Sequence, residues 1–126
     1  MTGLRAFDEQ RASAVETLCE LIVPGSRRVG SVVYVDALVA GMPPPVRDAA
    51  LASIDALAPA AAQGADALAE KAQTPEFGFV RALAIEAYYS DFVAAGSDGP
   101  GAWTEIDFNS PLATRLAKDW TWLGIV

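Results

Sequence analysis

Residues 74–92, TPEFGFVRALAIEAYYSDF, decide the fold that this sequence predicts. Thr74 is a good N-cap and Pro75 suits the first helical position, so a helix is expected to begin here. The residues that follow are apolar on nearly every side, and the few polar ones do not gather on one face. A helix of this kind is buried on several sides. In a chain of 126 residues it is therefore either the central helix of the core or a helix shared with a partner.

The composition of the whole chain favours helices. Hydrophobic residues make up 52% of the sequence and charged residues 20%, which is typical of a folded domain. Much of the hydrophobic fraction is alanine, while threonine and isoleucine are few, so closely packed helices are favoured over sheets. We expect a single all-α domain over residues 1–126. It is predicted to be a compact bundle of about five helices around a central apolar helix at about 75–92, with an irregular aromatic C-terminal segment.

Hydrophobic periodicity and the Pro and Gly residues place the other elements. We expect helices at residues 4–23, 32–40, 45–62, 64–72 and 110–120, where 64–72 is either a short amphipathic helix or the continuation of 45–62. We expect a connector at residues 25–31, a loop at 93–101 and a short extended segment at 103–108. Pro59 is expected to kink its helix or end it early. The β-branched start of residues 32–40 also suits a strand, but no convincing second strand is available to pair with it.

The charge and the rare residue types exclude several classes of function. The net charge is −7, which disfavours nucleic acid as a partner because phosphate binding needs clustered Lys and Arg. The chain has no histidine and one cysteine, Cys19, which is expected to be a buried thiol in the first helix. An internal disulfide, a cysteine-based metal cluster and histidine-based catalysis are therefore excluded. The sequence has no apolar run of about 18 residues, so no membrane span is expected.

The remaining candidates for chemistry are carboxylates, and no spacing groups them with a second reactive side chain. Glu86 and Asp91 are five residues apart and do not share a helix face. We expect Asp91 to be solvated near the helix end and Glu86 to bond a neighbour. Asp98 lies in a Ser-Asp-Gly stretch that lacks the further oxygen ligands of a calcium loop. We therefore assign no catalytic, cofactor-binding or metal-binding residue to this chain.

One block of sequence resembles a known family. Residues 86–91 read EAYYSD, a glycine-rich loop follows at 96–101, and residues 102–108 read AWTEIDF. Together with LCELIVPG at residues 18–25, this order resembles the gluconate 2-dehydrogenase subunit 3 family. The family consists of the small subunits of membrane-associated sugar dehydrogenases, whose large subunit is a flavoprotein of the glucose-methanol-choline oxidoreductase type.

The resemblance implies an all-helical, non-catalytic accessory subunit of the gamma type. Such a subunit binds the flavin-bearing catalytic subunit and helps it to fold, stay stable or be exported. FAD is then expected in the partner subunit, and no cofactor in this chain. Family members typically begin with a twin-arginine export signal, and none is present here. We therefore expect a cytoplasmic location as the sequence stands, or a periplasmic one if an export signal was removed or the partner is exported.

Aromatic residues are the best candidates for the surface that binds the partner, because they bury much area with few torsions to freeze. The candidates are Tyr88, Tyr89, Trp103, Trp120 and Trp122. The alternative is that they fill the domain's own core, and for Tyr88 and Trp103 the two readings are equally supported. Residues 120–126 are unusually apolar for a terminus, so we expect this segment to dock on the large subunit.

Two other classes of function stay open at this point. The chain is alternatively a self-associating helical module whose apolar C-terminal segment closes a homodimer, without a flavoenzyme partner. A stand-alone enzyme is the third reading, since carboxylates, tyrosines and serines are available, although no spacing groups them.

Overall fold

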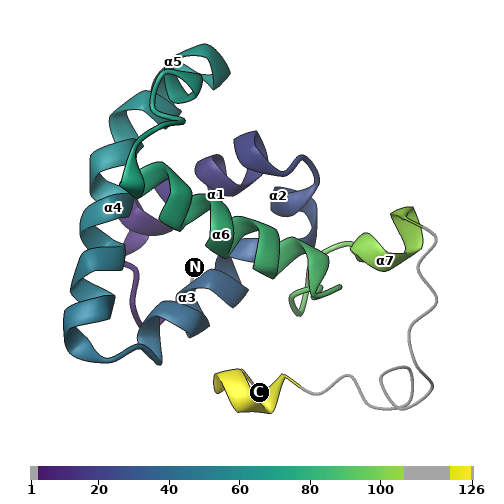
Figure 1. The fold of residues 1–126 in the computed structure, drawn as a ribbon. Helices are drawn as coiled ribbons and strands as arrows, with labels where there is room; N and C mark the ends of the chain where they lie inside the picture. Colours follow the sequence, from purple (N-terminus) through teal and green to yellow (C-terminus); the bar gives the residue numbers. More distant parts are fainter. Residues whose placement is uncertain (1–2, 107–119, 126) are drawn as a thin grey trace.

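The fold is described by a computed structural model for residues 3–106 and 120–125. The described chain is all-helical, as the composition predicts, and has seven α-helices in place of about five (Figure 1). In chain order the elements are α1 (Glu9–Ile22), α2 (Ser26–Val29), α3 (Ser31–Ala40), α4 (Pro44–Gln63), α5 (Ala65–Ala69), α6 (Pro75–Tyr89), α7 (Ala102–Glu105) and the 3₁₀-helix η1 (Thr121–Leu123).

Helix α6 begins where the sequence predicts. The Thr74 hydroxyl accepts a hydrogen bond from the Phe77 N–H at 3.2 Å, and Pro75 takes the first helical position. One side of α6 is buried against α4, α3 and α1, through Val80, Leu83, Ala84, Ala87 and Tyr88. Its opposite side is not covered by any described residue. The expected burial on several sides is therefore not met by the described part of this chain alone.

The first helix starts later than its periodicity predicts. Residues 4–7 are not helical, and α1 begins after Asp8, whose carboxylate accepts the N–H of Arg11 at 2.8 Å as an N-cap. The segment before the cap binds instead to the carboxylate of Asp36 in α3, which is 2% exposed. Asp36 accepts the backbone N–H groups of three successive residues, Arg5, Ala6 and Phe7. A buried carboxylate needs such donors. Residues 4–7 are therefore not helical, although their apolar spacing suits a helix.

Two further expectations about local structure are wrong, and one of the two outcomes expected at Pro59 does not occur. The connector at residues 25–31 contains the one-turn helix α2, which lies between Gly25 and Gly30, both with left-handed backbones. Pro59 does not end α4 early, since the helix continues to Gln63. The segment predicted to be extended after residue 102 begins with helix α7, because its backbone is bound by side chains of the α6 end rather than by a strand. The helix predicted at 110–120 lies outside the described residues apart from Trp120.

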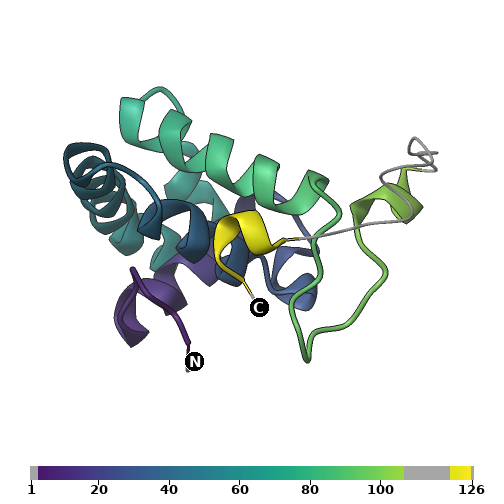
Figure 2. The same cartoon turned by 90° about the horizontal axis from the view of Figure 1, so that it is seen from below.

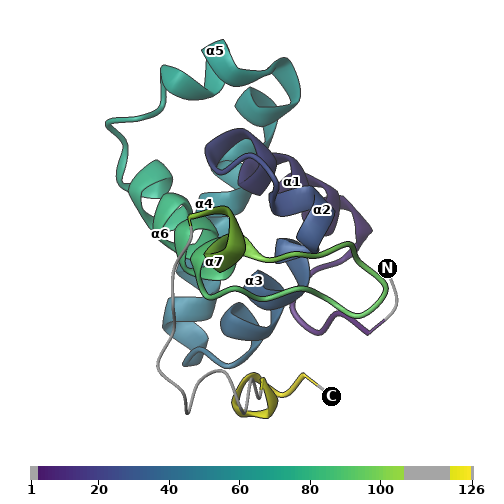
Figure 3. The same ribbon diagram turned by 90° about the vertical axis from the view of Figure 1, so that its right-hand side faces the viewer.

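The arrangement leaves α6 along one edge of the molecule, with the other helices on one side of it (Figure 2). The loop after α6 and helix α7 lie at the C-terminal end of α6 (Figure 1). The two ends of the described chain lie on the same side (Figure 3), where an Arg5 guanidinium N–H donates to the Leu123 carbonyl at 2.8 Å. Among the described helices, none has the length and apolar character needed to cross a membrane.

Candidate partner-binding surfaces

Tyr88 belongs to the interior and lies on no surface of the described fold. Its ring is 1% exposed, and its hydroxyl donates to a Glu105 carboxylate oxygen at 2.5 Å. Burial, followed by this hydrogen bond to Glu105, raises the pKa of Tyr88 to about 12. The core alternative therefore holds for Tyr88, which positions α7 rather than contacting a partner.

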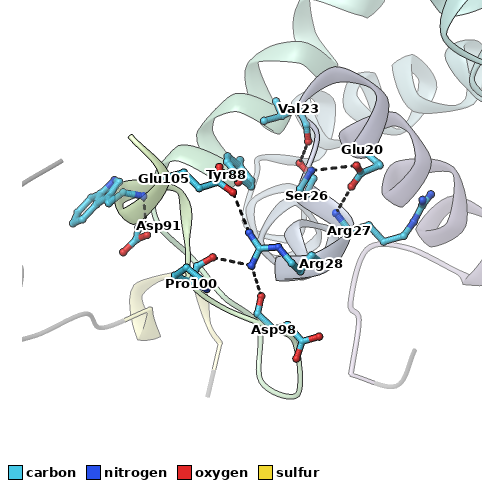
Figure 4. Close-up of polar contacts among 12 residues, drawn as sticks. Glu20, Val23, Ser26, Arg27, Arg28, Tyr88, Asp91, Asp98, Pro100 and Glu105 are labelled. Atoms are coloured by element: carbon cyan, nitrogen blue, oxygen red, sulfur yellow. Dashed lines mark hydrogen bonds and ion pairs between the residues drawn. The ribbon is translucent and has the colours of Figure 1, made fainter. Parts of the chain in front are cut away.

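Arg28 holds the loop after α6 and helix α7 in place (Figure 4). Its Nη1 donates to the carbonyls of Asp98 at 2.7 Å and Pro100 at 2.9 Å. Its Nη2 lies 3.3 Å from the carboxylate of Glu105, the residue that also accepts from Tyr88. Arg28 is thus used within the fold.

Asp91 also fixes α7, contrary to the expectation that it is solvated. The residue is 8% exposed and has a left-handed backbone, with φ 68°. Its carboxylate accepts the backbone N–H of Trp103 at 3.0 Å. A Cβ at Gly101 would lie 2.2 Å from the same carboxylate, so this close approach requires glycine. The EAYYSD and AW segments of the sequence therefore meet in space because Asp91 binds the start of α7.

Tyr89, Trp103 and Ile106 form an apolar group at this end of the molecule, in which Trp103 is half-buried. The Trp103 indole N–H donates to the Tyr89 carbonyl at 2.8 Å, which places the two residues side by side. Ile106 follows three residues after Trp103 at the end of α7, so both lie on the same side of that short helix. Tyr89 is 45% exposed and Ile106 55%. The structure thus brings two of the predicted interface residues together and adds Ile106.

The C-terminal segment contains one inward and one outward tryptophan. Trp120 is half-buried and makes edge-to-face contacts with Phe92, at a ring distance of 5.4 Å, and with Tyr34, at 6.1 Å. Trp122 contacts only the edge of this cluster, 6.4 Å from the Tyr34 ring, and is 65% exposed. Leu123, which follows Trp122, is 7% exposed. The segment is therefore anchored on the domain by Trp120 and Leu123 and presents Trp122 outward.

Tyr34 is the residue whose ring contacts Phe92, Trp120 and Trp122. It is 2% exposed, and its hydroxyl donates to Glu86 at 3.0 Å, so Glu86 bonds a neighbour as expected. Burial, followed by the charge of Glu86, raises the pKa of Tyr34 to about 12. The Tyr34 side chain, which Trp120 and Trp122 contact, is therefore neutral and hydrogen-bonded at any physiological pH.

A cleft of about 500 Å³ lies between α1 and α4 and holds the ion pair of Arg11 and Asp55. The guanidinium donates to both carboxylate oxygens, at 3.0 and 2.8 Å, and its hydrogen bond lowers the pKa of Asp55. Both side chains are partly exposed, and their charges satisfy each other. We assign no ligand to this cleft. Among the described residues, no three His, Cys, Asp or Glu side chains gather as metal ligands.

The chain matches no known protein family, no curated protein and no solved structure. The family resemblance of the 86–108 block stays a prediction.

Sequence reasoning missed Asp36, Arg28 and the outward side of α6. Asp36 is the one charged residue in the apolar run 32–40, which is a signal of a buried, hydrogen-bonded carboxylate. Nothing local in the sequence links Arg28 to residues 98–105, because the two are brought together only by the fold. For α6, the signal is Gly78 at the end of the first turn of the predicted helix, since glycine inside a helix is unfavourable without a packing reason.

Proposed function

We propose that this chain is a non-catalytic accessory subunit that binds and stabilises the flavin-containing catalytic subunit of a sugar or alcohol dehydrogenase. The observation that carries the proposal is Trp122, a large apolar ring that is 65% exposed on an anchored segment. Its position is supported by the Tyr34 ring, by buried Leu123 and by the Arg5 hydrogen bond to the Leu123 carbonyl. The sequence resemblance of residues 86–108 supports the nature of the partner.

An anchored tryptophan is well suited to bind a protein. The ring has little freedom to lose on binding, so most of the gain from burying it is retained. Truncation of a tryptophan at the centre of an interface typically costs about 2 kcal/mol or more, which corresponds to about a 30-fold loss of affinity. A single side chain of this kind can therefore decide whether a complex survives purification.

The role proposed for this chain is thermodynamic rather than chemical. A subunit that binds the folded form of its partner, and not the unfolded form, shifts the partner toward the folded form by mass action. Oxidation of the sugar or alcohol then belongs to the flavin of the partner, which accepts the hydride. The buried and mutually bonded carboxylates of the described residues serve the fold in this proposal.

The test compares two exposed apolar residues by affinity capture from the native cell extract. Trp122→Ala removes the proposed anchor, and Val46→Ala is the matched control because Val46 is an exposed apolar residue of α4. We expect the wild-type chain and the Val46 variant to retain a larger flavoprotein through washing. We expect Trp122→Ala to retain little of it, with an unchanged helical circular dichroism spectrum. Equal retention by all three proteins would remove Trp122 from the interface.

A further inference from the structure

The outward face of α6 is an apolar helix surface that the described residues leave largely exposed. We define this face as Gly78, Ala82, Ile85 and Tyr89, which follow one another at spacings of four, three and four residues. Gly78 and Ala82 are exposed, Ile85 is half-buried and Tyr89 is 45% exposed. The spacing places all four on one stripe of the helix. Figure 2 shows the other described helices on one side of α6.

Gly78 has no structural reason within the described part of the chain. Its backbone is helical, and a Cβ built there would meet no atom within 4 Å. A glycine in a helix interior costs about 1 kcal/mol relative to alanine. Internal packing therefore does not explain the residue, whereas a second helix that approaches α6 closely from outside does, as small residues permit close contact of two backbones.

We infer that the outward face of α6 binds the same face of a second copy of this chain, with the two helices parallel. In heptad notation, Gly78 and Ile85 take position d, and Ala82 and Tyr89 take position a. Arg81 then falls at position g and Glu86 at position e, on the two flanks of the stripe. In a parallel pair a g residue meets the e residue five positions later on the other helix. Arg81 and Glu86 are separated by five residues.

Charge complementarity selects the second copy and the parallel orientation. A parallel pair forms two equivalent Arg81–Glu86 contacts, one on each flank, whereas an antiparallel pair brings the Arg81 flank against itself. Both side chains are exposed, and Arg81 makes no ion pair or hydrogen bond with any described residue. Glu86 uses one carboxylate oxygen to accept from Tyr34 and has the other available. Each copy thus offers, at matching positions, one charge of each sign that makes no ion pair with a described residue.

The parallel orientation also brings the apolar group at the end of α6 next to the same group of the second copy. Because the two C-terminal ends lie together, Tyr89, Trp103 and Ile106 of one copy extend the contact alongside the same residues of the other. Helix α6 has 15 residues and is about 22 Å long, so the interface is at the small end of specific contacts, below about 1,200 Å². We expect a concentration-dependent dimer with a Kd on the order of 10 µM.

The test is analytical ultracentrifugation of the full chain across a concentration series at low salt. We expect wild type to dimerise and Arg81→Glu to weaken the dimer at least tenfold, since both flanks then hold like charges. Lys71→Glu is the control, because it makes the same change of charge at an exposed residue before α6. We expect this control to dimerise like wild type. A wild-type chain that stays monomeric, or an Arg81→Glu variant that dimerises normally, would overturn the inference.

Two further variants separate pairing from misfolding. Glu86→Gln keeps an oxygen that can accept from the Tyr34 hydroxyl, and it is expected to weaken the dimer because each flank then lacks its negative charge. The double variant R81E/E86Q is expected to dimerise better than Arg81→Glu alone, because the like charges on both flanks are removed. A double variant that dimerises no better than Arg81→Glu would contradict the pairing. The outcome is independent of flavoprotein capture, which is tested at Trp122.

Discussion

Replacement of Asp36 is predicted to destabilise the domain strongly. Asp36 is 2% exposed in α3. One of its oxygens accepts the N–H groups of Ala6 at 2.8 Å and Phe7 at 3.0 Å, and the other accepts that of Arg5 at 2.9 Å. These three bonds attach the N-terminal segment to α3. The same segment contacts the C-terminal segment through Arg5, so Asp36 supports both.

The magnitude follows from the burial of the three donors. In Asp36→Ala the buried N–H of Phe7 loses its acceptor, which costs about 1–3 kcal/mol. The N–H groups of Arg5 and Ala6 are only partly buried, so water replaces part of each bond and the loss is about 0.5–1 kcal/mol each. The sum is about 3 kcal/mol. For a chain of this size, that corresponds to a fall in Tm of about 12 °C.

Asp36→Asn is the matched variant. Its remaining carbonyl oxygen can keep the bonds to Ala6 and Phe7, while its amide N–H₂ faces the N–H of Arg5 and cannot accept from it. We expect a loss of about 1–1.5 kcal/mol, less than half that of the alanine variant. Urea unfolding followed by circular dichroism measures both. An alanine variant within about 0.5 kcal/mol of wild type, or an asparagine variant less stable than the alanine one, would refute this account of the N-terminal attachment.

Three other predictions concern stability and titration. Gly78→Ala is expected to raise the free energy of unfolding by about 1 kcal/mol, because the site is helical and open; urea unfolding of dilute, monomeric protein checks this, and a loss of stability would show an unseen clash. Folding raises the pKa values of Tyr34 and Tyr88 from 10.0 to about 12. Their contribution to stability is therefore present below pH 10 and is lost as the pH rises to about 12, because the unfolded chain releases these protons first. The free energy of unfolding should be lower at pH 11 than at pH 9, and equal values would argue against this account. Burial, with the charges of Glu16 and Glu20, raises the pKa of Cys19 to about 12, so a thiol reagent is expected to modify it only in the unfolded protein, and rapid reaction in the native state would contradict its burial.

The parts of the fold that the sequence predicts are those with local signals. Thr74 and Pro75 mark the start of α6 by capping chemistry that acts within one turn. The helix at 32–40 follows from the lack of a second strand. The late start of α1 could not be predicted from periodicity, because residues 4–7 are bound by a carboxylate about 30 residues away in the sequence.

The candidate surfaces were predicted only in part, because an apolar helix does not reveal which of its sides faces inward. The sequence could not separate Tyr88, which is interior, from Tyr89, which is exposed. The two tryptophans of the C-terminal segment also look alike in sequence. Only their contacts with Tyr34 and Phe92 show that Trp120 serves as the anchor and Trp122 faces outward.

The most direct test of the accessory-subunit account is the absorbance spectrum of the complex that the wild-type chain retains from its native extract. After affinity capture and size-exclusion chromatography, the account predicts a larger co-eluting protein with the absorption bands of bound flavin, at a constant ratio to this chain across the peak. A colourless peak that contains this chain alone would contradict the account, and a dimer in that peak would leave a self-associating helical module.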